Sequence, residues 1–291
     1  MGFKHFFHKI KMYFVRAKEL RIPYIDKVKL YGDFGEEKFT ELLCQELPSC
    51  KIKRNVIVSG KEGKAEIDCL VLYDDKLFAI EIKSWKGRIV EQEGEFLQEK
   101  TDCYTGEKHM KYLRSPFHQI ERAIYLLKKS VPIKAWINAI VFFENNELTD
   151  ISVDSNKVWF NDIRNLVNYI RSEGKSSFGK TAKDFFDECV PADCLYGNYS
   201  EQYLHCTINR DLFQIDTPQG VIVSENITSI RIIHHWWFDE LWIKMSDGGK
   251  ITCMQENAKI QVKCNGYDRE YALCNLNYIE FGRTLNSEID A

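Results

Sequence analysis

Residues 64–87 read KAEIDCLVLYDDKLFAIEIKSWKG, two apolar runs with charged residues set into them at regular places. The runs Ala65–Tyr73 and Leu77–Lys83 are rich in Val, Leu, Ile and Phe, which is typical of β-strands. Only the short segment Asp74–Lys76 joins them, and it allows nothing but a tight reversal. The two runs are therefore predicted to pair as antiparallel strands.

The charged residues of both runs occupy alternate positions. Side chains along a strand alternate between the two faces of a sheet. Four charged side chains are thereby predicted to lie opposite the apolar residues between them: Glu66, Asp68, Glu81 and Lys83. Ile67 and Cys69 are expected together on the other face of the first strand. Charges placed in such apolar strands are costly unless they pair with one another or bind a metal ion.

Two carboxylates and an ammonium in this arrangement suit the cleavage of a phosphodiester. That reaction needs an activated water, stabilisation of charge at phosphorus and help for the leaving oxygen. Mg²⁺ supplies much of this and prefers one or two carboxylates, water and substrate phosphate as ligands. Asp68 and Glu81 are suitable hard oxygen ligands, and Lys83 could orient or deprotonate the attacking water. Mg²⁺, or Mn²⁺ in its place, is the expected cofactor.

The segments around these strands predict an α/β unit. Apolar residues at helical spacing, continuous apolar runs and bounding prolines indicate a helix, a strand, a second helix, a buried strand and two more helices. In chain order these are Gly35–Leu47, Ile52–Val58, 115–129, Ala135–Phe143, Asp162–Arg171 and Phe178–Cys189. The polar segment 88–114 is expected to form loops and a short hairpin.

Beyond Pro191 the sequence changes character. Short alternating runs are separated by turn signals such as Asp247-Gly248 and Asn265-Gly266, which favour β-hairpins. A boundary is expected near residue 190. The predicted domains are a basic amphipathic helix with a linker, an α/β domain and an accessory β-rich domain, over 1–30, 31–190 and 191–291.

The net charge of −3 is unevenly distributed. Residues 1–30 carry eight basic and two acidic side chains, whereas 176–291 carry ten basic and 17 acidic ones. An enzyme that acts on nucleic acid needs a local cationic surface, which the first segment could supply. Its amphipathic helix could instead pack against the core or a second subunit, which is the favoured interpretation, or lie on a membrane surface.

Several classes of protein are disfavoured by the sequence. No run of about 18 apolar residues is present, so no transmembrane segment is predicted. The N-terminus lacks the apolar run and cleavage site of a secretory signal. Ten cysteines are scattered without a CxxC pair, which argues against a disulfide framework or a zinc site. A cytoplasmic protein is expected.

The order of the motifs resembles the nuclease-related domain family, NERD, of the PD-(D/E)XK or restriction-endonuclease-like superfamily. The resemblance covers roughly residues 32–143. It rests on Gly35-Glu36, Glu66-Ile67-Asp68, Glu81-Ile82-Lys83 with Trp85 and Gly87, and Ser115-Pro116 with Gln119. It implies a restriction-endonuclease-like core of order αβββαβ, a mixed central sheet flanked by helices. Two departures from related nucleases are Ser84, where many members have Asn, and Ala123, where some have Tyr.

The resemblance also implies roles for individual residues. Asp68 and Glu81 would be metal ligands, and Lys83 the catalytic lysine. Glu36 would reach the metal directly or through water, although its neighbour Glu37 could equally do so. Gln119, on a helix, is expected to approach the site. Glu66 and Trp85 are expected beside the metal ligands or on the substrate side of the site.

The sequence thus predicts a metal-dependent nuclease that hydrolyses nucleic acid, with DNA the expected substrate and repair or defence against foreign DNA as settings by analogy of fold. A homodimer is plausible, and the C-terminal domain could recognise a protein partner. The alternatives are a catalytically silent nuclease fold that binds nucleic acid or protein, and a peripheral membrane protein held by the first helix. A cross-strand ion pair on a solvated sheet face is the plainest interpretation of the charged residues.

Overall fold

The structure of the protein is a computed structural model that describes residues 22–286 apart from short internal segments. The segments not described are 25–26, 61, 93, 102–103, 145–156, 178–180, 200–201, 211–212, 218–219, 224–225, 236–237, 256–258, 265–266 and 283. The basic helix expected near the start of domain 1–30 lies outside the described residues.

The chain forms two compact units. Among the described residues, 28–191 and 284–286 belong to one unit, and 22–24 with 192–282 belong to the other. The chain passes from the first unit to the second after Pro191 and returns to the first at Thr284. The unit formed by residues 28–191 and 284–286 is called the α/β unit, and it contains every predicted site residue.

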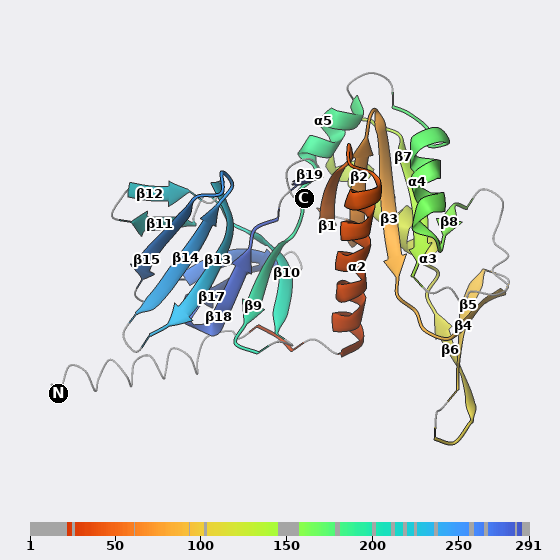
Figure 1. The fold of residues 1–291 in the computed structure, drawn as a ribbon, viewed down its shortest axis with the longest axis horizontal. Helices are drawn as coiled ribbons and strands as arrows, with labels where there is room; N and C mark the ends of the chain where they lie inside the picture. The colour runs from red at the N-terminus through yellow and green to blue at the C-terminus, as the bar shows by residue number, and fades with distance from the viewer. Residues whose placement is uncertain are drawn as a thin grey trace. The chain divides into compact units, whose positions relative to one another are not determined.

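The α/β unit is built on a mixed six-stranded sheet with strand order β19-β1-β2-β3-β7-β8 (Figure 1). Its strands are β1 (Lys51–Gly60), β2 (Gly63–Tyr73), β3 (Lys76–Lys83), β7 (Ile137–Phe143), β8 (Trp159–Phe160) and β19 (Thr284–Asn286). β19, β1, β2 and β3 pair antiparallel, whereas β3, β7 and β8 run parallel. Asp74 makes the predicted tight reversal between β2 and β3 with a left-handed φ of 53°.

Helices cover both faces of this sheet (Figure 1). α2 (Lys27–Glu46) and α4 (Ile163–Ser172) share one apolar core with the sheet, and α3 (Pro116–Ser130) and α5 (Thr181–Glu188) share another. Ser115 caps α3 by accepting a hydrogen bond from the His118 backbone N–H at 3.5 Å. β3 is buried between the two cores, since Phe78 and Ile80 face α2 while Ala79 faces α3.

The predicted fold class is confirmed. The order α2-β1-β2-β3-α3-β7 follows the expected αβββαβ sequence of elements and is compatible with a nuclease-like core. α2 begins at Lys27, eight residues before the predicted start at Gly35.

The prediction of loops and a short hairpin over 88–114 is wrong. This segment forms a three-stranded antiparallel sheet of β4 (Arg88–Gln92), β5 (Glu95–Thr101) and β6 (Lys108–Leu113). Ile89 and Phe96 anchor its base in the core beneath α3, while β6 is exposed along most of its length. So few buried residues leave little apolar alternation for sequence analysis to detect. Figure 1 shows this β4–β6 sheet extending beyond the end of β3.

The second unit is antiparallel and β-rich. Its eight-stranded sheet has the order β15-β14-β13-β18-β9-β10-β16-β17. In chain order its strands are β9 (Asp193–Gly197), β10 (Tyr203–Ile208), β13 (Ile227–His234), β14 (Asp239–Met245), β15 (Lys250–Gln255), β16 (Lys259–Cys264), β17 (Tyr267–Ala272) and β18 (Leu276–Glu280). β11 (Gln214–Thr217) and β12 (Gly220–Val223) form a separate hairpin, and a 3₁₀ turn, η2 (Leu273–Asn275), precedes β18.

One buried carboxylate joins distant parts of this β-rich unit. Asp193 accepts hydrogen bonds from the backbone N–H groups of Ile208 and Gly282 at 2.7 and 2.8 Å, and from Arg210 Nη2 at 2.7 Å. Its three partners satisfy the charge that burial would otherwise make costly. In the part of the chain that the structure describes, no helix of either unit is long and apolar enough to span a membrane.

Candidate active site

The alternation of side chains breaks at Asp68. Arg54 pairs with Cys69 and Val56 with Ile67, while Asn55 between them has a left-handed φ of 50°. Ile67 packs in the core beneath α3, whereas Cys69 packs in the core beneath α2. The prediction that Ile67 and Cys69 share a face is therefore wrong, because β1 and β2 both change face at this point.

Asp68 is held against the next strand at this break. Its Oδ2 accepts a hydrogen bond from the backbone N–H of Ile82 at 2.8 Å, which places the carboxylate beside the segment between Glu81 and Lys83. Lys83 Nζ donates to Glu81 Oε1 at 2.5 Å. Two carboxylates and one ammonium from two adjacent strands thus gather at the end of β3.

The environment of these groups is not a solvated sheet face. Glu81 is 5% exposed and the Lys83 side chain 18% exposed. The interpretation as a surface ion pair does not hold at this burial, because removing charges from water is costly unless other interactions compensate.

The cluster carries more negative than positive charge. Burial raises the pKa of Asp68 well above its usual value, and the charges of Glu81 and Glu36 raise it further. Burial also raises the pKa of Glu81 despite the neighbouring Lys83. For Lys83, burial opposes the charged form, but the carboxylates of Glu81 and Asp68 outweigh it and raise its pKa. The arrangement therefore favours uptake of a further cation.

Gly35 explains how α2 comes close enough to contribute. A Cβ added at this position would collide with the side chains of Ser84, just after β3, and Glu144, just after β7. A larger residue at this position would displace these two side chains. The next residue, Glu36, adds its charge to the surroundings of both Asp68 and Lys83. Glu37 instead lies 3.9 Å from Arg54, so the structure separates these two neighbouring acids.

The remaining nominated residues lie at the margin of the cluster or away from it. Glu66 is exposed on β2, and its charge raises the pKa of Glu81. The Trp85 ring packs against Phe96 and Phe143, with centroid separations of 5.9 and 5.8 Å. Gln119 lies on α3 with a buried Oε1 that has no hydrogen-bond partner among the described residues. No described hydrogen bond joins Gln119 to the charged cluster.

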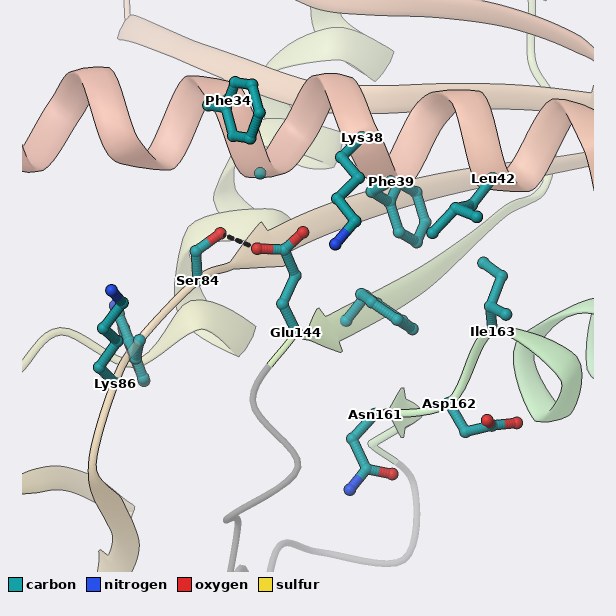
Figure 2. Close-up of a pocket in the computed structure, with 13 residues that line it drawn as sticks. Phe34, Lys38, Phe39, Leu42, Ser84, Lys86, Glu144, Asn161, Asp162 and Ile163 are labelled. Carbon is teal, nitrogen blue, oxygen red and sulfur yellow. Dashed lines mark hydrogen bonds between the residues drawn. The ribbon is translucent and has the colours of Figure 1, made fainter.

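A cleft of about 450 Å³ is lined by Ser84 and Gly35, the chain neighbours of Lys83 and Glu36 (Figure 2). Its walls come from α2, the segment after β3, the end of β7 and the start of α4. Ser84 donates a short hydrogen bond to Glu144 inside it. Sequence analysis missed Glu144, although one signal was available. Glu144 directly follows β7, which is buried and runs parallel to β3. It therefore lies at the same edge of the sheet as Lys83.

Comparison with known families gives one match. Residues 31–144 match the family described as NERD, the nuclease-related domain. This segment is a nuclease-related domain. The NERD domain runs from α2 to the residue after β7, so it includes Glu36, Asp68, Glu81 and Lys83 together with Glu144. No curated protein and no solved structure matches the chain.

The donor set of the NERD domain limits which metal would fit. Among the described residues, no group of three or more His, Cys, Asp or Glu side chains could hold a metal by itself. This disfavours a closed zinc site, which requires four protein ligands. Asp68 and Glu81 together offer two carboxylates, a set that suits Mg²⁺ because that ion retains water and binds substrate phosphate. The excess negative charge of the cluster agrees with such a cation.

Proposed function

We propose that the NERD domain hydrolyses phosphodiester bonds of nucleic acid with a divalent cation held by Asp68 and Glu81. The observation that carries this proposal is the convergence of the half-buried Asp68 carboxylate and the buried Glu81 carboxylate with the ammonium of Lys83 at the end of β3. Mg²⁺ or Mn²⁺ would supply charge neutralisation at the phosphate and a water of lowered pKa.

The protein's own residues would then divide the work. Asp68 is oriented by the Ile82 N–H, which fixes one of its oxygens and leaves the other for a ligand. Glu81 holds Lys83 in place through the 2.5 Å contact. Because the pKa of Lys83 is raised, its side chain is an ammonium at neutral pH. Of the two roles predicted for this lysine, the structure favours orienting water and stabilising charge over removal of a proton.

Nucleic acid as the substrate class is supported by basic residues in the segment that leads from β3 to α3. β6 and the residue that follows it carry Lys108, His109, Lys111 and Arg114 without an intervening acid. All but Arg114 belong to exposed positions of the β4–β6 sheet, and Lys108 also contacts Glu99 at 2.7 Å. A basic strand in the same unit as the cluster would contact the phosphate backbone without reading sequence.

The test is cleavage by the full chain of plasmid, linear duplex DNA, single-stranded DNA and RNA, with Mg²⁺, Mn²⁺ or EDTA. We expect metal-dependent cleavage that Glu81→Gln and Lys83→Ala abolish. Glu41→Gln and Lys134→Ala change the same residue types at exposed positions of the same unit and serve as matched controls. Cleavage that persists unchanged in both site variants would refute the proposal.

A second candidate is a silent NERD domain that binds nucleic acid without cutting it. The ion pair that already engages one oxygen of Glu81 favours it, because the pair competes with a metal for that carboxylate. Binding of nucleic acid that does not need divalent metal, with no cleavage of any of the substrates above, would support this candidate. Homodimerisation, a partner for the β-rich unit, membrane attachment and a cytoplasmic location stay predictions.

A further inference from the structure

The cleft borders the charged cluster on two elements. Ser84 in its wall directly follows Lys83, and Gly35 in its wall directly precedes Glu36. Two lining residues are thus each one position along the chain from a residue of the cluster, which makes the cleft a candidate place for the nucleotide that adjoins the cleaved phosphate.

We infer that this cleft receives an unpaired nucleobase of the strand that the cluster cleaves, an inference that rests on the proposed function. The substrate would then be single-stranded, or a duplex with an overhang or frayed end. A paired base cannot enter a pocket without first leaving the helical stack, which costs free energy.

The lining of the cleft matches a flat, neutral ligand with a polar edge. Phe34 projects from α2 with 66% of its surface exposed and lines the cleft. Such a ring is a ready stacking platform for a base, and stacking of this kind tolerates any sequence. The Asn161 amide and the Ser84–Glu144 pair supply hydrogen-bonding groups for a base edge. Figure 2 shows Lys38 directed toward Glu144.

Charge and volume exclude other occupants. Glu144 and Asp162 in the lining disfavour a phosphate group inside the cleft, while Lys38 and Lys86 disfavour a lipid chain. The two lysines can instead meet the phosphates on either side of an inserted base. The volume of about 450 Å³ lies within the range of about 300–1,000 Å³ typical of small-ligand pockets.

The test measures binding separately from cleavage. Single-stranded oligonucleotides that carry the fluorescent base 2-aminopurine at successive positions are titrated with the full-length Lys83→Ala variant in Mg²⁺ and with unsubstituted protein in EDTA. We expect the fluorescence of one position to be quenched by stacking, and blunt duplex of the same sequence to bind more weakly. In the Lys83→Ala background, Phe34→Ala should weaken single-strand binding by about 5- to 150-fold and remove the quenching.

Tyr125→Ala is the matched control, because Tyr125 is a half-exposed aromatic residue of α3 that does not line the cleft. Equal effects of Phe34→Ala and Tyr125→Ala, the lack of any quenched position, or equal binding of duplex and single strand would each overturn the inference. The cleavage assay separates this result from failure of the proposed function. Cleavage with no base-specific quenching would refute the base pocket alone. Quenching without cleavage would refute the nuclease activity and support the base pocket.

Discussion

The substitution Asp68→Asn should make the protein more stable while it removes activity. Asp68 is half-buried beside Glu81 and Glu36, and burial together with these two charges raises its pKa because each opposes the ionised form. Amidation removes the charge but keeps an oxygen that can accept from the Ile82 N–H. The effective penalty for a buried ion is several kcal/mol, and the substitution removes it. The hydrogen bond from the Ile82 N–H becomes weaker in the variant, which offsets about 1 kcal/mol of this gain. We expect a net gain of about 1 to 3 kcal/mol in the free energy of unfolding.

The pH dependence of this gain follows from the direction of the pKa shift. Because the folded-state pKa of Asp68 is raised above 3.8, the native state holds that proton more tightly than the unfolded state does. The free energy of unfolding of the original protein therefore falls as pH rises from 3.8 through the raised pKa. The advantage of the Asn variant should be largest at neutral pH and shrink toward pH 4.

Thermal unfolding followed by circular dichroism at pH 4 to 8, in EDTA and in Mg²⁺, is the assay. A gain of 1 to 3 kcal/mol corresponds to a rise in Tm of about 2 to 10 °C for a unit of this size. Mg²⁺ should raise the Tm of the original protein and leave that of Asp68→Asn unchanged, because only the original offers the ligand. Asp75→Asn, at an exposed turn position, is the control. A lower Tm for Asp68→Asn at pH 7 in EDTA would refute the reasoning.

Three other substitutions test the packing around the site and in the second unit. Gly35→Ala should lower the free energy of unfolding by about 1 to 3 kcal/mol through overpacking and should reduce cleavage. Gly32→Ala on the same helix, with open space around it, should raise that free energy by up to about 1 kcal/mol. Urea unfolding measures both, and equal effects would contradict the close approach of α2. Lys53→Met should lower the free energy of unfolding by about 2 to 4 kcal/mol, because the buried ammonium donates to the carbonyls of Phe186 and Cys189 at 2.6 and 2.7 Å. Lys51→Met, at an exposed position, is the control. A loss no larger than the control's would contradict a stabilising role for Lys53. Asp193→Ala should destabilise the β-rich unit by about 3 to 5 kcal/mol, because Arg210 and the backbone N–H groups that donate to Asp193 would lose their acceptor. Asp268→Ala, at an exposed position, should have no effect. Hydrogen exchange of β9 and β10 measures the difference, and unchanged protection would contradict the role of Asp193.

The central strands could be predicted from the sequence because their apolar residues are continuous and their connection is short. Periodicity alone could not predict the change of face at Asp68. It depends on the left-handed backbone of Asn55 in the neighbouring strand, and Asn is one of several residues that tolerate this conformation without requiring it. Strict alternation nevertheless predicted that Asp68 lies near Glu81 and Lys83, and it does so because Asp68 reaches β3 from the irregular position through the Ile82 N–H.

The cleft escaped sequence analysis for a different reason. Its lining comes from four segments between Phe34 and Ile163, and each segment contributes only two to five residues. No local pattern connects such residues, since their proximity depends on the parallel pairing of β3 with β7 and on the approach of α2 at Gly35. The β4–β6 sheet was missed likewise because two buried residues, Ile89 and Phe96, hold it to the core.

The same geometric constraint links the cluster and the cleft. α2 can bring Glu36 toward Asp68 only where Gly35 allows it to pass close to Ser84 and Glu144, and that passage also forms one wall of the cleft. A side chain at position 35 would therefore alter the charge near the carboxylates and the shape of the neighbouring hollow together. Cleavage and base binding should respond jointly to Gly35→Ala, whereas Phe34→Ala and Lys83→Ala should separate them. A helix that passes this close to the sheet thus places the acidic residue and shapes the base pocket through one glycine.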